Sequence, residues 1–405
     1  MAQHDSSDVF AGAQRAAHYI EPEYTVSGDD AHAVGVQARA IAEDSAAVPP
    51  APEQIELPPV PGEPAAQHRA PGDADPSAGD NSETAMMRDT IFLDPVADLS
   101  AASTVQQRPR ATRGLRGLIS KMGISVEPGA AERTELEAAE AVRRDEEKIR
   151  QATWTRAVSI LVANKKGGSG KTPCSVSIGG VLAAVRGGSV CILEVSDDPG
   201  ALTFRSEGNP SLGVGELVRD ASRITSAGQL AGYTAPQTSF ASVIGTVGRR
   251  PRLTREDVIA GAGVIDEFYA IRVMDSGNQP SSSAFDGTVE TADALVIPLL
   301  NAGDAVLEAV AMVDELRARG GRAAQLADNA VVIRLTDGRP EHPQVLERVE
   351  RIIESMRVRA VYHVPYDAHI AERGQITLAR LAPATRAAFT AAAAGVVESL
   401  KITVH

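Results

Sequence analysis

Six apolar runs alternate with helical patterns along the later part of this 405-residue chain, and this alternation constrains the fold more than any other feature. The runs are continuously apolar, which is typical of strands buried on both faces of a parallel sheet. The helices between them supply the crossover connections that parallel strands need. We therefore expect a doubly wound α/β fold with a mostly parallel sheet. The expected strands lie at 157–164, 188–196, 269–277, 293–300, 330–335 and 360–365, and the expected helices at 172–186, 254–268, 302–319, 342–357 and 383–401.

The first quarter of the chain has a different composition. Residues 1–108 hold 18 acidic and 5 basic side chains, a net charge of −13, and 11 of the 24 prolines, whereas the remainder holds 35 of each charge. Such a segment cannot bury enough apolar surface to offset the entropy of ordering it. We expect residues 1–108 to form a disordered acidic, proline-rich leader. Its start lacks the basic residues and apolar core of a secretory signal.

Residues 109–153 are expected to connect this leader to an α/β domain at 154–405. The stretch 108–124 carries five basic side chains and no acidic one. It would form either a solvated linker or a short amphipathic helix that contacts DNA, anionic lipid or an acidic partner. The stretch 130–152 contains no Gly or Pro, so we expect a helix that packs on the following domain, with Trp154 as one contact.

Cysteine content and hydropathy restrict the cellular compartment that we expect for the protein. Cys174 and Cys191 are the chain's two cysteines, which fits a reducing compartment better than a disulfide framework. No stretch approaches the ~18 apolar residues of a membrane span. We therefore expect a cytoplasmic protein without stable membrane insertion. Two weaker alternatives are a redox role for the cysteine pair and a metal site at His363 and His369.

A glycine-rich stretch, VANKKGGSGKT at 162–172, follows the first expected strand and opens the first expected helix. Bare backbone lets N–H groups approach an oxyanion, and a helix N-terminus adds partial positive charge. We therefore predict a phosphate-binding loop, placed at the carboxyl end of a strand where ligands of such sheets bind. Lys171 would contact the β- and γ-phosphates, and Thr172 would bind Mg²⁺ through its hydroxyl. The predicted loop residues are Lys166, Gly167, Gly168, Ser169, Gly170, Lys171 and Thr172.

This loop resembles the deviant Walker A loop of the ParA/MinD family of ATPases, and the resemblance extends over 155–405. The family's extra lysine, matched here by Lys166, reaches across a dimer interface to the nucleotide of the partner. The segment VCILEVSDDPGAL (190–202) resembles the family's second strand and switch loop. Asp198 then matches the carboxylate that acts near Mg²⁺ and the attacking water.

Two further segments carry the resemblance in the family's order. YAIRVMDSG resembles the Walker B strand, which implies that Asp275 lies next to the metal and Gly277 near the γ-phosphate. YHVPYDAHIAE resembles the late segment in which a proline, here Pro365, lies beside the base. Tyr366 and Asp367 follow it and are candidates for the base and ribose side of the pocket.

The chain departs from the family pattern at several positions. Pro173 follows Thr172 where relatives have a backbone N–H on the α-phosphate, so this contact is missing. Ser196 stands where many relatives carry an aspartate, and Asp197 is a candidate replacement. Arg334 aligns with an asparagine that reads adenine, which leaves the choice between ATP and GTP open.

The resemblance implies a function as well as a fold. It implies a Mg²⁺- and ATP-dependent ATPase that forms a homodimer around two nucleotides and hydrolyses ATP slowly, under stimulation by a protein partner. It implies a switch in the positioning or partition of DNA, or of a secretion or conjugation apparatus. The whole chain most resembles actinobacterial MinD/ParA-like proteins associated with type VII secretion or mobile elements. Non-specific DNA is a further candidate partner. The alternative is a nucleotide-binding scaffold without significant hydrolysis that recruits partners through its acidic leader.

Overall fold

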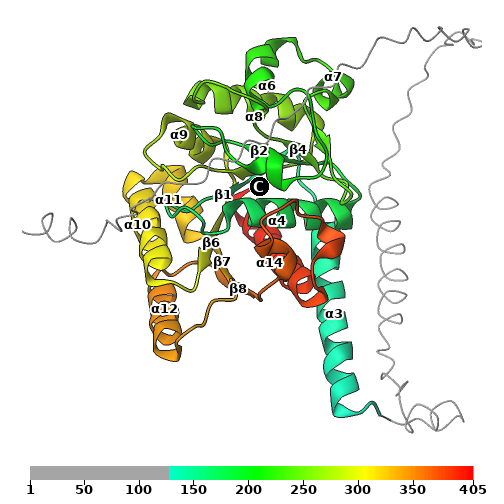
Figure 1. Cartoon of the computed structure of the whole chain (residues 1–405), viewed down its shortest axis with the longest axis vertical. Helices are drawn as coiled ribbons and strands as arrows, with labels where there is room; N and C mark the ends of the chain where they lie inside the picture. Colours follow the sequence, from blue (N-terminus) through cyan, green and yellow to red (C-terminus); the bar gives the residue numbers. More distant parts are fainter. Residues whose placement is uncertain (1–126, 405) are drawn as a thin grey trace, which may run out of the picture. The chain divides into compact units, whose positions relative to one another are not determined.

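An eight-stranded sheet forms the centre of residues 127–404, the part of the chain that the computed structural model describes (Figure 1). The predicted leader and basic stretch lie outside these residues. The strand order is β3-β4-β2-β5-β1-β6-β7-β8, and all neighbours are parallel except β3 and β4. The strands are β1 (Val158–Val162), β2 (Val190–Glu194), β3 (Ala235–Pro236), β4 (Ser242–Ile244), β5 (Ile271–Asp275), β6 (Ala294–Leu300), β7 (Val331–Leu335) and β8 (Ala360–Val364).

Helices cover both faces of this sheet, which makes the fold a doubly wound α/β fold with a mostly parallel sheet, as predicted. One buried core lies between the sheet and α3, α4 and α14, and the other lies between the sheet and α6, α8, α9, α10, α11 and α12. The longer helices are α3 (Ala130–Gln151), α4 (Lys171–Arg186), α6 (Val214–Asp220), α8 (Arg255–Phe268), α9 (Ser283–Thr291), α10 (Gly303–Arg319), α11 (Gly321–Asp328), α12 (Pro343–Ser355) and α14 (Pro383–Thr403), and the short ones are α5 (Leu202–Arg205), α7 (Ala227–Ala231) and α13 (Ala368–Ala371).

The six predicted strands are confirmed as β1, β2, β5, β6, β7 and β8, and the predicted helices as α3, α4, α8, α10, α12 and α14. The central strand β1 shows why a continuous apolar run predicts a buried strand. All five of its residues are buried, and neighbours such as Ile160 and Leu161 point into opposite cores. A strand with two apolar faces reads as a continuous apolar run.

The register places three strand ends side by side. Val162 at the end of β1 pairs with Asp275 at the end of β5, and Glu194 at the end of β2 also pairs with Asp275. The loops that follow β1, β2 and β5 therefore begin at one level of the sheet. The predicted phosphate loop is the first of these.

The last turn of helix α3 packs against the rest of the domain. Ile149 and Ala152 are buried, and the Arg186 guanidinium of α4 donates to their carbonyl oxygens at 2.8 and 2.7 Å. The same guanidinium lies 5.3 Å from the centre of the Trp154 ring. The predicted packing is confirmed, while the earlier turns of α3 project beyond the sheet and its helices (Figure 1).

The two cysteines are free and buried, Cys174 in α4 and Cys191 in β2. Burial raises the pKa of both thiols, so neither is a ready thiolate at neutral pH. Within residues 127–404, no helix is both long enough and apolar enough to span a bilayer.

We predict that Ile149→Ala lowers the free energy of unfolding of the full chain by about 2–5 kcal/mol, because it removes a fully buried side chain between α3, α4 and α14. The matched control is Leu136→Ala on the exposed part of the same helix. Denaturant unfolding followed by circular dichroism measures both. Equal midpoints for the two variants would show that α3 does not contribute to the domain.

Candidate functional site

A cavity of about 1060 Å³ opens beyond the carboxyl ends of the central strands. Its walls come from the glycine-rich loop after β1 and from the loops after β2, β5, β7 and β8. This is the edge at which the sequence predicted a site. The predicted residues that line it are Lys166, Gly167, Gly168, Gly170, Lys171, Thr172, Pro173, Asp198, Asp275, Gly277, Pro365, Tyr366 and Asp367.

Two predicted residues do not line this cavity. Ser169 is buried within the loop. The Arg334 side chain donates to Asn301 Oδ1 at 3.0 Å and pairs with Glu350 of α12 at 3.1 Å. The structure therefore does not bring Arg334 to the wall where a base would be read.

The glycine-rich loop presents a row of backbone donors. Within residues 127–404, the N–H groups of Gly167, Gly168, Gly170, Lys171 and Thr172 make no hydrogen bond to a protein acceptor, while a turn at Gly167 and Gly168 brings the Ser169 N–H toward the Lys166 carbonyl. The helix ladder of α4 begins only where the Cys174 N–H bonds the Gly170 carbonyl at 3.0 Å. Gly170 has φ +96°, and a Cβ there would collide with Leu335, so glycine is required. Unpaired N–H groups at a helix start are the usual binding site of a phosphate.

Lys171 places a buried ammonium against this row of donors. Its Nζ donates to the carbonyl oxygens of Asn164 and Lys166 at 3.1 and 3.2 Å, and to Asn278 Oδ1. Burial lowers its pKa to about 8. No carboxylate of the described residues forms an ion pair with this ammonium, and the charge of Asp275 stabilises it only from a longer distance. A phosphate would supply the missing negative charge.

A buried carboxylate lies beside the loop. Asp275, at the end of β5, accepts hydrogen bonds from the hydroxyls of Thr172 at 2.7 Å and Ser175 at 2.9 Å. Burial raises the pKa of Asp275 to about 6, against the opposing effect of these two hydroxyl donors. A divalent cation would stabilise the ionised form and take both Thr172 and Asp275 as oxygen ligands.

The residues present fit a Mg²⁺ ion that the protein would hold jointly with substrate phosphates. Residues 127–404 contain no cluster of three or more His, Cys, Asp or Glu side chains able to hold a metal. Mg²⁺ commonly binds through one or two protein oxygens plus substrate phosphates, and Thr172 and Asp275 meet that requirement. The alternative metal site at His363 and His369 has no such cluster behind it in the described part of the chain.

The two aspartates after β2 differ in environment. Asp197 is 8% exposed, and its Oδ1 would lie 3.0 Å from a Cβ at Gly277, so the loops after β2 and β5 touch there. The Asp198 side chain is 56% exposed and pairs with Arg252 at 2.9 Å. Both residues line the cavity. The predicted role of Asp198 remains a prediction, and Asp197 becomes its rival because its carboxylate oxygen is the nearest atom to a Cβ at Gly277.

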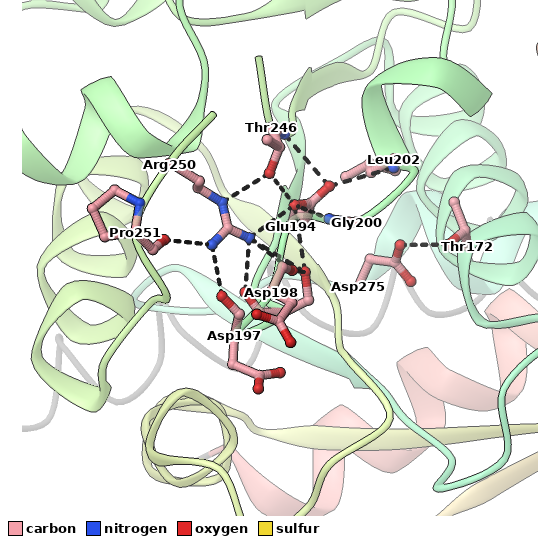
Figure 2. Close-up of polar contacts among 11 residues, drawn as sticks. Thr172, Glu194, Asp197, Asp198, Gly200, Leu202, Thr246, Arg250, Pro251 and Asp275 are labelled. Carbon is pink, nitrogen blue, oxygen red and sulfur yellow. Dashed lines mark hydrogen bonds and ion pairs between the residues drawn. The ribbon is translucent and has the colours of Figure 1, made fainter. Parts of the chain in front are cut away.

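The loop that carries these aspartates is held by a buried ion pair that the sequence analysis missed. Glu194 and Arg250 pair at 3.1 Å, with side chains 1% and 2% exposed (Figure 2). Glu194 also accepts the Gly200 N–H at 2.9 Å and the Thr246 hydroxyl. Thr246 in turn accepts from Arg250 Nε at 2.8 Å. A buried pair with this many partners satisfies the condition under which burying charge is tolerated.

Arg250 binds the loop through its backbone. Its guanidinium donates to the carbonyl oxygens of Ser196, Asp197 and Asp198 at 2.9, 2.8 and 3.0 Å (Figure 2). One side chain from a distant segment thus fixes three consecutive residues at the cavity wall. A charged residue at the end of the apolar run VCILE marked Glu194 in the sequence, but nothing local marked Arg250.

Lys166, Tyr366 and Asp367 are the remaining predicted residues of the site. Lys166 Nζ pairs with Asp304 at the start of α10 at 2.8 Å, and this pairing raises the pKa of Lys166. Tyr366 presents an exposed ring to the cavity. The Asp367 carboxylate is occupied structurally, since it accepts the backbone N–H groups of His369 and Ala382, each at 2.9 Å.

No protein-family model matches this sequence, and no curated protein matches it. Solved structures do resemble it. A ParA family ATPase from Chlorobium tepidum is 12% identical, with a TM-score of 0.46 over 60% of this chain and 96% of that one. The MinC:MinD cell division complex of Aquifex aeolicus matches at 18% identity and 0.45, over 58% and 94%. MinD with Mg-ADP from Pyrococcus horikoshii matches at 15% and 0.43, over 58% and 94%.

We predict that Arg250→Met lowers the free energy of unfolding by about 3–5 kcal/mol, because it leaves the buried Glu194 carboxylate without a counter-charge. Replacing both partners, as Glu194→Gln with Arg250→Met, restores part of the loss. Amide hydrogen exchange at 196–202 rises in the single variant.

The matched control for Arg250 is Arg252→Met, which breaks only the exposed pair with Asp198 and changes stability by less than about 0.5 kcal/mol. Denaturant unfolding with hydrogen-exchange mass spectrometry gives both readouts. Unchanged exchange at 196–202 in Arg250→Met would contradict the role of Arg250 in holding the loop.

Proposed function

We propose that this chain is a Mg²⁺-dependent ATPase that dimerises with bound ATP and acts as a switch in the positioning or partition of DNA or of a macromolecular apparatus. The observation that carries the proposal is the set of loop N–H groups between Gly167 and Thr172 that have no protein acceptor, next to the buried Lys171 ammonium, which forms no ion pair with a described carboxylate. This arrangement fits the β- and γ-phosphates of a nucleotide. The motif resemblance to ParA/MinD ATPases supports ATP as that nucleotide.

Each residue of the site has a proposed role in hydrolysis. Lys171 and the loop N–H groups stabilise negative charge on the transferring phosphoryl group. Bound Mg²⁺ would supply further charge neutralisation between the phosphates, held by Thr172 and Asp275. Asp198 or Asp197 orients the attacking water, and Arg250 keeps both at the cavity wall. A protein partner that stimulates this slow step and an ATP-dependent homodimer belong to the same proposal.

A nucleotide-binding scaffold without significant hydrolysis is the second candidate. Two observations favour it. Asp198 pairs with Arg252 at the surface, and Pro173 withholds a backbone donor from the first turn of α4. In this case ATP would control only the assembly of the protein, and the leader would recruit partners.

Steady-state phosphate release with matched aspartate variants separates the two candidates. We expect the wild-type chain to release phosphate slowly from Mg-ATP, and Lys171→Ala to lose nucleotide binding. Asp197→Asn and Asp198→Asn each remove one carboxylate with little change of shape. The variant that lowers turnover by about 100-fold or more while keeping ATP affinity identifies the carboxylate that orients water. Binding without any turnover in the wild type would establish the scaffold.

We predict that Lys166→Ala binds ATP within about tenfold of the wild type but stays monomeric and does not hydrolyse it. The reason is that Lys171 already serves the phosphates within one subunit, so a second lysine is needed only for the partner's nucleotide. The matched control is Lys165→Ala, which removes the neighbouring lysine that pairs with Glu315. Light scattering with a slowly hydrolysed ATP analogue gives the oligomeric state. Normal dimerisation of Lys166→Ala would refute the role in trans.

A further inference from the structure

Arg205 is a buried arginine whose charge has no counter-ion in the described part of the chain. It lies in α5, is 8% exposed and lines the cavity. Its guanidinium makes one hydrogen bond, to the Ile370 carbonyl at 3.3 Å, and its Nε has no partner among residues 127–404. An arginine carries five N–H donors. Burying a charge with most donors unused is costly unless a ligand satisfies them.

A second cation lies close to Arg205. Arg373 also lines the cavity, and its positive charge contributes with burial to lowering the pKa of Arg205. Arg373 has φ +55°, in the left-handed region that non-glycine residues rarely adopt. Two like charges on one cavity wall repel each other in the absence of an anion. The closeness of these two cations points to a negatively charged ligand at this place.

The position of Arg205 indicates which part of a ligand it meets. The helix α5 packs against α4, whose first turn contains Pro173 at the same cavity. Pro173 has no backbone N–H, and the Cys174 N–H already donates to the carbonyl oxygen of Gly170. Lys171 and Thr172 are thus the only residues of this turn with a free backbone donor before Cys174. Arg205 lines the same cavity as Pro173, on a helix that contacts α4.

We propose that Arg205 binds the α-phosphate of the nucleotide and replaces the backbone donor that Pro173 lacks. This inference rests on the nucleotide-binding function proposed above. In the proposed function the glycine-rich loop and Lys171 hold the β- and γ-phosphates, and Pro365 and Tyr366, the candidates for the base, line the same cavity. The phosphate between these two regions is the one attached to the sugar. A planar guanidinium with free donors suits such a phosphate oxygen.

Competition titrations of the full chain against a fluorescent ADP analogue test this assignment, with ADP, AMP and adenosine as competitors. Arg205→Met should lose about tenfold to a hundredfold in affinity for ADP and AMP, while adenosine competes as in the wild type. Arg205→Lys keeps the charge and should lose less. The matched control is Arg380→Met, an exposed arginine outside the cavity that pairs with Glu372.

The melting temperature without nucleotide distinguishes a ligand-binding role of Arg205 from a structural role. Arg205→Met removes an uncompensated buried charge, so its melting temperature should equal or exceed that of the wild type. A structural role predicts a lower melting temperature. Should Arg205→Met fail to fold, Arg205→Lys still gives the comparison of AMP with adenosine.

The outcomes are distinct. Unchanged ADP and AMP affinity in Arg205→Met would overturn the α-phosphate assignment and leave the ATPase proposal intact. An equal loss for adenosine would also overturn it, because Arg205 would then shape the pocket rather than bind phosphate. A wild-type chain that binds neither ATP nor ADP would overturn the proposed function itself.

A double-mutant cycle adds an internal check. Pro173→Thr introduces the missing N–H, so it should improve ADP affinity more in the Arg205→Met background than in the wild type. Equal effects in both backgrounds would show that the two residues do not serve the same phosphate, and would overturn the proposed replacement.

Discussion

The buried ion pair between Glu194 and Arg250 is the interaction on which the geometry of the site depends. Parallel strands bring the ends of β1, β2 and β5 to one level, but they leave the loops beyond them undefined. The ion pair fixes the loop after β2 against the sheet, and it does so in a place without water, where breaking one partner is far more costly than losing a surface pair.

The phosphate loop and the Asp275 carboxylate form a second fixed unit. Asn164 links this loop to β6, since its amide donates to the Pro298 carbonyl at 2.8 Å while its Oδ1 accepts the Lys166 N–H at 2.9 Å. The cavity therefore lies between two loops that are each anchored by buried polar groups. Lys171 and Arg205, two buried cations that form no ion pair with a described carboxylate, both line the cavity.

Sequence patterns predicted the strands and long helices because each buries a continuous apolar face, and they located the site because glycines and lysines crowd one strand end. They missed β3 and β4 and the helices α5, α6, α7, α9, α11 and α13, which are too short to show a sustained apolar period. They also missed Arg250 and Arg205, since an arginine far along the chain carries no local mark of its burial. Arg334 was aligned to the cavity, but its side chain turns toward Glu350 instead.

Arg250 holds the loop after β2 mainly through main-chain carbonyl oxygens, which every residue type has, with one further contact to the Ser196 hydroxyl at 3.4 Å. Ser196 adds a side-chain contact of its own, since its hydroxyl donates to the Asp198 carbonyl at 2.6 Å. The hold of Arg250 on the loop is therefore independent of the side chains at 197 and 198. Substitutions at these positions can change the chemistry that faces the cavity without changing where the backbone runs. A chain built in this way separates the evolution of its reactivity from the evolution of its scaffold.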